Sequence, residues 1–300
     1  MDVARAIEGA VAKNPAMQKA HWGMVVRDGQ GRVLYQHNPD DLFTPASNLK
    51  LITASTVTHV LGADHRFATR LLADGTVDSH GVLHGDVYLQ GTGDPSLTTA
   101  DLKAAVQHLP FHHVDGKVHV DDSAFDNVHT GAGWEPGDLS QPYGAESDAL
   151  TLDENVAALT VTRHSIEQPS DDGYLVLHNH TQAGSQTELQ AERQLETNDV
   201  TVTGTVGPHG GEVPITMHEP ALYAGHVLKT LLHATGTVDK APAQGHIVWE
   251  HTSPPLLDLQ RHMLKESDNL YAETLFHALA QGQSAQAPGI ERQTLHLNRP

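Results

Sequence analysis

The contrast between the middle of the chain and its two ends constrains the fold more than any other feature of the sequence. In the middle, short segments alternate apolar with polar residues and are separated by glycine and aspartate, a pattern typical of half-buried β-strands. The predicted strands cover residues 67–72, 82–90, 114–120, 159–161, 174–179 and 200–206. Helices are predicted among them at residues 102–109 and 222–234. The sequence therefore predicts a β-rich inserted region of two lobes over residues 66–252.

The two ends of the chain show helical patterns and one hairpin. A helix stopped by Pro15 is predicted near the start, and a β-hairpin follows at residues 23–37, where two apolar runs flank a glycine turn. A second helical block begins near Pro255. We therefore predict that residues 1–65 and 253–300 together form one α/β (α+β) domain that the inserted region interrupts.

Ser47 and Lys50 stand where a loop turns into a predicted helix that Gly62 closes. The buried stripe of this helix is predicted to consist of Leu49, Ile52, Val57, Val60 and Leu61. Ser47 then lies in the first turn, with Lys50 one turn later on the same face. A serine nucleophile needs a nearby base, and a lysine serves as one where its pKa is lowered enough to leave it neutral. Because Ser-x-x-Lys occurs roughly once by chance in a chain of this size, the pair alone is weak evidence.

Composition excludes several classes of function. The formal net charge of −19 argues against nucleic acid and anionic membranes as partners. Protonation of all 23 histidines would change this charge to +4, so it depends steeply on pH. The absence of cysteine excludes disulfides, thiolate metal sites and cysteine nucleophiles. No His-Glu-x-x-His occurs and histidine pairs are expected by chance, so no metal site is predicted. No signal peptide is visible at the start of the chain, and no apolar run approaches transmembrane length.

Ser267, Asp268 and Asn269 form a polar island inside the second helical block. Such a triplet alone is a good helix N-cap or turn sequence. Together with Ser47 and Lys50, however, it matches the pattern of penicillin-recognising serine enzymes. The chemistry accounts for the set, because Ser267 can pass a proton between Lys50 and a leaving amine. The side-chain amide of Asn269 can hold both the substrate peptide and the lysine.

Four stretches extend this similarity along nearly the whole chain. They are residues 43–54 (FTPASNLKLITA), 83–95 (LHGDVYLQGTGDP), 121–125 (DDSAF) and 265–273 (KESDNLYAE). In order and spacing they resemble the class C low-molecular-mass penicillin-binding proteins, which are D-alanyl-D-alanine carboxypeptidase/endopeptidases. The resemblance implies a penicillin-binding-protein/β-lactamase-like serine transpeptidase domain split by two inserted lobes. It also implies peptidoglycan stem peptides as substrates, β-lactams as inhibitors, an extracytoplasmic location and no metal or organic cofactor.

The same family reads the free amino end of the stem peptide through a stretch similar to residues 134–143, which contains Trp134, Asp138 and Tyr143. The resemblance implies that Asp138 pairs with a substrate ammonium and that Tyr143 supplies an apolar wall. A surface loop around a packed tryptophan is the alternative.

The third motif of the family, Lys-Thr-Gly, does not occur in the 300 residues, and the nearest string, at residues 234–236, lacks the cation. In the family this motif lies about a hundred residues beyond Ser-Asp-Asn, holds the substrate carboxylate and contributes to the oxyanion hole. We therefore expect the transpeptidase-like domain to be C-terminally incomplete in this chain.

The function predicted from these features is that of a serine D-alanyl-D-alanine carboxypeptidase or endopeptidase that forms an acyl-enzyme on Ser47. One alternative is a related serine β-lactamase or esterase that uses the same serine and lysine. Another is a non-catalytic peptidoglycan-binding fragment, which the absence of Lys-Thr-Gly favours. The sequence does not distinguish carboxypeptidase from endopeptidase activity, diaminopimelate from lysine stem peptides, or one oligomeric state from another.

Overall fold

The computed structural model describes residues 2–131, 133–168 and 173–286, so the last part of the predicted 253–300 segment lies outside the described residues. The chain divides into two compact units, Met1–Ala46 and Ser47–Pro300. All the predicted catalytic residues belong to the second unit. No helix among the described residues is both long enough and apolar enough to span a bilayer.

The first unit consists of two short helices and a hairpin. Its elements are α1 (Val3–Ala12), α2 (Pro15–Lys19), β1 (Met24–Arg27) and β2 (Val33–His37). The predicted hairpin is confirmed, because β1 and β2 pair antiparallel. Pro15 was expected only to stop a helix, but it also begins α2. The Asn14 side chain caps this helix by accepting from the backbone N–H of Ala16, and the first helical position needs no N–H donor of its own.

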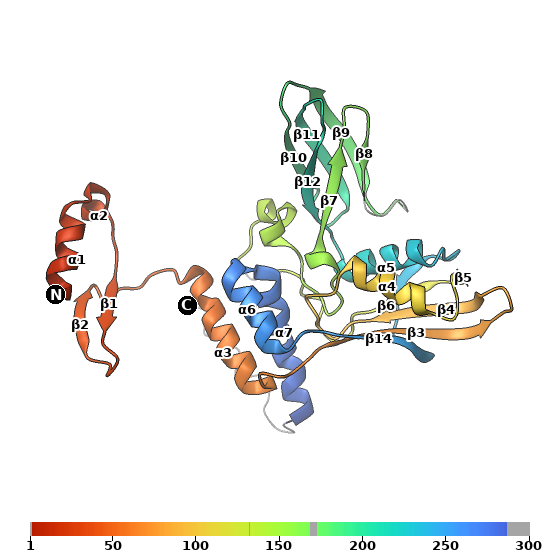
Figure 1. Cartoon of the computed structure of the whole chain (residues 1–300), viewed down its shortest axis with the longest axis horizontal. Coiled ribbons are helices and arrows are strands. Elements are labelled where there is room, and N and C mark those ends of the chain that lie inside the picture. The colour runs from red at the N-terminus through yellow and green to blue at the C-terminus, as the bar shows by residue number, and fades with distance from the viewer. Residues whose placement is uncertain (1, 132, 169–172, 287–300) are drawn as a thin grey trace. The chain divides into compact units, whose positions relative to one another are not determined.

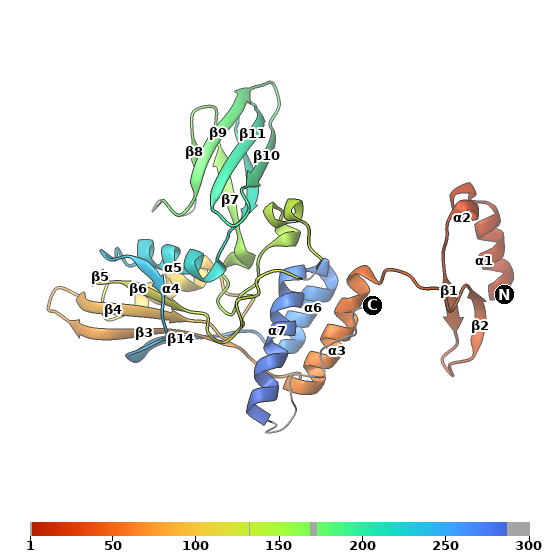
Figure 2. The same ribbon diagram turned by 180° about the vertical axis from the view of Figure 1, so that it is seen from behind.

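Three helices of the second unit form a layer in which segments far apart in the sequence lie side by side (Figures 1 and 2). They are α3 (Leu49–Leu61), α6 (Leu256–His262) and α7 (Asn269–Gln286), and a π-helical turn, Met263–Ser267, joins the last two. Apolar side chains of all three share one core. The buried Gln260 ties α6 to α3, since its amide donates to the carbonyl oxygen of Ala54 at 2.9 Å and its oxygen accepts from the Thr58 hydroxyl.

The buried face of α3 agrees with the predicted one only in part: Val57 is fully buried and Val60 and Leu61 pack against the shared core, but two of the predicted residues are exposed. Leu49 and Ile52 are 53% and 64% exposed, whereas Lys50, Ala54 and Val57 are buried. The reason is that α3 carries apolar residues on more than one face, and the packing partner, α7, decides which face is covered. The prediction that Gly62 closes this helix is confirmed, and its φ of 89° is one that a glycine adopts without strain.

The predicted β-rich middle is confirmed. Among the described residues, six strands form a mixed sheet in the order β13-β6-β4-β3-β14, with β5 also paired to β4. These strands are β3 (Ala68–Val77), β4 (Val82–Gln90), β5 (His113–Asp115), β6 (Val118–Asp121), β13 (Val238–Lys240) and β14 (His246–Thr252). The predicted helices are α4 (Thr99–His108) and α5 (Pro220–Leu231), and α5 packs against β6 and β13.

The remaining strands form a lobe that Figure 1 shows beside the larger sheet. One of its sheets has the order β12-β7-β8 and the other the order β10-β11-β9. The strands are β7 (Val156–Val161), β8 (Ile166–Glu167), β9 (Val176–Ala183), β10 (Glu188–Arg193), β11 (Asp199–Val206) and β12 (Gly211–Thr216). One apolar core runs through the lobe, the larger sheet and α5. The boundaries at residues 66 and 252 stay a prediction.

A fully buried loop, residues 144–152, passes between the two apolar cores. Ala145 belongs to the core of the helices, and Leu150 and Leu152 belong to the core of the sheets. The strand end after β4 approaches this loop closely, because a Cβ at Gly91 would lie only 2.2 Å from the carbonyl oxygen of Ala149. A glycine is therefore required there, and the loop fixes the insertion against the helices.

Candidate active site

The nucleophile predicted from the sequence lies at the positive end of a helix. Ser47 occupies a 3₁₀ turn, Ala46–Asn48, directly before α3 rather than the first turn of α3 itself, and its side chain is exposed. Lys50 is the second residue of α3 and is only 6% exposed. Its Nζ lies 3.3 Å from Ser47 Oγ, so the predicted hydroxyl and amine are within hydrogen-bond reach.

The Ser-Asp-Asn turn brings two further groups to this pair from about 220 residues away. The hydroxyl of Ser267 donates to Ser47 Oγ at 2.9 Å, and Lys50 Nζ donates to Asn269 Oδ1 at 2.5 Å. Ser267 adopts a φ of 59°, which is uncommon for a serine and directs the chain out of the π-helical turn. The structure thus brings together all four residues predicted to be catalytic.

The surroundings of Lys50 favour the neutral amine. Burial lowers the pKa of Lys50 below its ordinary value, and the negative charges of Asp268 and Glu273 oppose this shift in part. The two acceptors of Lys50 Nζ, Ser47 Oγ and Asn269 Oδ1, also favour the protonated amine, so burial alone accounts for the lowered pKa. A lysine in this setting can act as a general base at a lower pH than an exposed one.

Glu273, whose negative charge raises the pKa of Lys50, was not predicted from the sequence. Its burial raises the pKa of its carboxyl group, and the charge of Lys50 opposes that rise. A Cβ at Gly131 would come within 2.9 Å of a Glu273 oxygen, so the inserted segment also packs closely there. Helical spacing could have indicated this residue, because Glu273 follows Asn269 by one turn on α7.

The two residues predicted to bind the substrate lie next to each other. The Tyr143 hydroxyl donates to Asp138 Oδ1 at 3.1 Å, and this hydrogen bond raises the pKa of Tyr143. The other oxygen of Asp138 accepts from the backbone N–H of Glu135 and caps the 3₁₀ turn Pro136–Ser140. Tyr143 also connects this segment to the residues predicted to be catalytic, since its carbonyl oxygen accepts from the side-chain amide of Asn269 at 2.8 Å.

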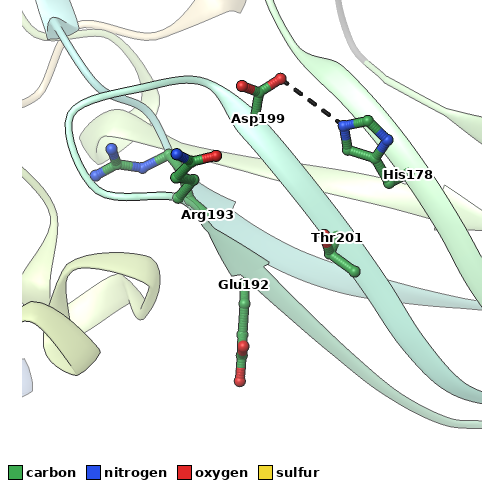
Figure 3. Close-up of a pocket in the computed structure, with 6 residues that line it drawn as sticks. His178, Glu192, Arg193, Asp199 and Thr201 are labelled. Carbon is green, nitrogen blue, oxygen red and sulfur yellow. Dashed lines mark ion pairs between the residues drawn. The ribbon is translucent and has the colours of Figure 1, made fainter.

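A pocket of about 590 Å³ opens elsewhere in the second unit, on strands β9 to β11 (Figure 3). Its lining includes His178 and Asp199, whose charged atoms lie 3.8 Å apart, and Arg193. The Arg193 guanidinium is buried and committed to the carboxylate of Glu146 at 2.9 Å. None of the six predicted site residues lines this pocket, so we assign the candidate active site from the side-chain geometry around Ser47.

Comparisons with known proteins identify relatives along most of the chain. It is 32% identical over 303 residues to the D-alanyl-D-alanine carboxypeptidase of Actinomadura sp. (strain R39), covering 91% of this chain and 56% of that protein. The crystal structure of penicillin binding protein 4 (dacB) from Haemophilus influenzae matches with a TM-score of 0.70 at 23% identity, covering 85% of this chain and 61% of that one. The structure of the same protein complexed with a β-lactam gives a TM-score of 0.59 at 21% identity. The chain therefore spans a little more than half the length of these relatives.

These structural matches confirm the predicted penicillin-binding-protein/β-lactamase-like fold. A family model matches residues 3–299, a range that includes α3, the inserted region and the Ser-Asp-Asn turn. The family resemblance predicted from four short stretches is confirmed by this match. The chain belongs to the D-Ala-D-Ala carboxypeptidase 3 (S13) family.

Proposed function

We propose that this protein is a serine D-alanyl-D-alanine carboxypeptidase/endopeptidase that acts on peptidoglycan stem peptides through an acyl-enzyme on Ser47. One observation carries the proposal: the Ser47 hydroxyl lies 3.3 Å from a buried lysine amine and 2.9 Å from a second serine hydroxyl. This arrangement supplies a nucleophile, a base and a proton relay. The name of the Actinomadura relative, a D-alanyl-D-alanine carboxypeptidase, supports the choice of substrate.

The first half of the reaction forms an ester on Ser47. Neutral Lys50 takes the proton of the hydroxyl, and Ser47 Oγ attacks the carbonyl carbon of the terminal D-alanyl peptide bond. Negative charge then develops on the carbonyl oxygen, which the positive end of α3 favours. As the carbon–nitrogen bond breaks, Ser267 passes a proton from Lys50 to the leaving amine, and free D-alanine departs.

The second half releases the peptide. A water molecule gives a proton to Lys50 through the same hydroxyl relay and attacks the ester carbon. As the ester bond breaks, Lys50 returns this proton to Ser47, and the shortened stem peptide leaves as a carboxylic acid that loses its proton to the solvent. Asn269 keeps the base in position throughout, because it holds Lys50 Nζ with its oxygen and the Tyr143 carbonyl with its nitrogen.

We further infer that Asp138 and Tyr143 receive the free amino group of the stem peptide. Asp138 already accepts two hydrogen bonds, and a carboxylate has about four lone-pair positions, so acceptor capacity remains for a substrate ammonium. Peptidoglycan as substrate places the protein outside the cytoplasm. The complex of the Haemophilus protein with a β-lactam supports β-lactams as inhibitors.

Labelling with a fluorescent penicillin, followed by intact-mass spectrometry, tests the nucleophile. We expect one penicilloyl group on the native chain, none on Ser47→Ala, and unchanged labelling of Ser55→Ala, which alters another exposed serine close to Ser47. A native chain that acquires no adduct would refute catalysis by this chain, as the binding-fragment alternative predicts. Labelling that persists in Ser47→Ala would refute the assignment of the nucleophile.

The fate of the adduct tests the class of enzyme. A penicilloyl group that persists for many minutes, together with release of D-alanine from a synthetic peptide ending in D-Ala-D-Ala, supports the proposed activity. Rapid hydrolysis of the adduct with no release of D-alanine would favour the β-lactamase or esterase alternative.

A further inference from the structure

Three side chains with metal-ligating atoms meet beside the Ser-Asp-Asn turn. They are Glu154, in the 3₁₀ turn Asp153–Asn155 that precedes β7, then His262, the last residue of α6, and Asp268. One donor atom of each lies within 4.8 Å of the donor atoms of the other two. The inserted region and the layer of helices therefore both contribute to this cluster.

The spacing of the cluster is longer than direct hydrogen bonds would give. The Nε2 atom of His262 lies 3.5 Å from Glu154 Oε1 and 3.7 Å from Asp268 Oδ2. A charge-assisted nitrogen–oxygen hydrogen bond has a length of about 2.7–2.9 Å. Ligands about 2.0–2.2 Å from a tetrahedral zinc ion lie roughly 3.3–3.6 Å from one another. The two measured distances thus approach the spacing of ligands around a shared ion.

The other contacts of these side chains leave the donor atoms facing one another. Asp268 Oδ1 accepts from the backbone N–H of Tyr271 at 2.9 Å, while Oδ2 faces His262. The Tyr271 ring packs on the His262 ring with 4.4 Å between centroids. His262 Nε2 is buried and makes no hydrogen bond within the described residues. Because this nitrogen carries at most one proton, it cannot form a linear hydrogen bond to both carboxylates.

We propose that Glu154, His262 and Asp268 bind one divalent cation of the zinc class, with water completing the coordination. One imidazole and two carboxylates are ligands typical of zinc and related first-row ions. The ion neutralises two carboxylates that otherwise repel each other. Serine acyl transfer requires no metal, so the role of the ion is structural. It ties the inserted region, through Glu154, to the turn that presents Ser267 and Asn269.

Zinc titration of the chelator-treated protein tests this site. The titration is followed by calorimetry in the presence of a competing chelator of moderate affinity, which suppresses binding to scattered surface histidines. We expect one equivalent of Zn²⁺ for the native chain and at least tenfold weaker binding for Glu154→Gln and His262→Asn. Circular dichroism confirms that each variant is folded. Binding of Co²⁺ to the native chain gives a test that needs no variant. Co²⁺ with a low coordination number absorbs visible light strongly, so the absorption spectrum reports the site.

His84→Asn is the matched control, since His84 also lies between two carboxylates, Asp78 and Asp115, but outside the cluster. Its zinc binding should equal that of the native chain. The proposal is overturned if the native chain takes up no stoichiometric Zn²⁺, or if His262→Asn binds zinc as tightly as the native chain does. Either result would leave His262 as a proton-sharing partner of the carboxylates. Metal binding is measured without β-lactam, so the outcome does not depend on acylation of Ser47.

Discussion

The buried carboxyl group of Asp148 should make the stability of this protein depend on pH. Asp148 is 2% exposed, and burial together with the adjacent Asp122 raises its pKa to about 8. Its other ionisable neighbours are Lys240, which pairs with Asp122 at 2.8 Å, and His129, whose Nδ1 lies 3.7 Å from Asp148 Oδ2. Glu219 in turn pairs with Lys240. Asp148 therefore keeps its proton at neutral pH.

The sign and the size of the effect follow from linkage. In the unfolded chain Asp148 ionises near its ordinary pKa of 3.8, whereas in the folded chain it ionises near 8. Between these values the folded state binds more protons, so the free energy of unfolding falls as pH rises. At about 1.36 kcal/mol per pH unit, the ceiling of this loss is roughly 6 kcal/mol. Because Lys240 lies close and favours the ionised carboxylate, we expect about a third of this ceiling.

Asp148→Asn should remove this pH dependence. The amide nitrogen can donate to Asp122 as the protonated carboxyl group does, and the amide oxygen can still accept from the backbone N–H of Ala149. We expect similar unfolding free energies for variant and native chain at pH 5, and a variant more stable by about 2 kcal/mol at pH 9. That difference corresponds to roughly 4–8 °C in melting temperature.

Urea and thermal denaturation at pH 5, 7 and 9 measure the difference, with Asp64→Asn, a change at an exposed aspartate, as the control. Other ionising groups affect native and variant chains alike, so the difference between their curves isolates Asp148. Parallel pH profiles for the native chain and Asp148→Asn would refute the reasoning. So would a variant that is less stable at every pH.

Two substitutions near the candidate active site give further predictions. Glu273→Gln removes a negative charge that raises the pKa of Lys50. The rise of the penicillin acylation rate with pH should therefore move to lower pH in this variant. Stopped-flow measurement of the rate at several pH values checks this, and an unchanged pH profile would contradict it. Asp138→Asn should raise the KM of a stem peptide with a free amino group by roughly tenfold, since a hydrogen bond to a charged group contributes about 1.5–3 kcal/mol. The N-acetylated peptide is the control, and equal effects on both peptides would argue against ammonium binding.

The sequence predicts part of the architecture because strand and helix periodicity is local, but β8, β12, β13 and β14 were not predicted and the strand predicted at residues 114–120 is two strands, β5 and β6. Strand β4 (Val82–Gln90) has the predicted bounds: Leu83, Val87 and Leu89 are buried at positions an even number of residues apart, and glycine follows the strand. Strand β10 (Glu188–Arg193) was missed because only Leu189 and Ala191 supply apolar alternation in an otherwise polar edge strand. The covered face of α3 was predicted only in part, because its apolar residues occupy several faces and the choice among them depends on tertiary packing.

Part of the candidate site could likewise be predicted from the sequence, and part of it could not. Ser47, Lys50, Ser267 and Asn269 could be predicted because two short motifs carry them. The electrostatic contribution of Glu273 was not predicted, since it depends on how closely α7 packs on α3. Neither was the cluster of Glu154 with His262 and Asp268, which folding assembles from segments more than a hundred residues apart.

The sequence left open whether the Ser-Asp-Asn triplet caps a helix or contacts Ser47 and Lys50. In the structure the triplet does both, with different residues. Asp268 caps α7 through the backbone N–H of Tyr271, as a helix-capping triplet would, while the residues on either side of it hold Ser47 and Lys50. The inserted region contacts this turn at two points. The carbonyl oxygen of Tyr143 accepts from Asn269, and Glu154 lies in one cluster with Asp268. A change in the insertion can therefore alter the position of the base and the relay without contacting either. The candidate active site therefore includes part of the inserted region as well as the layer of helices.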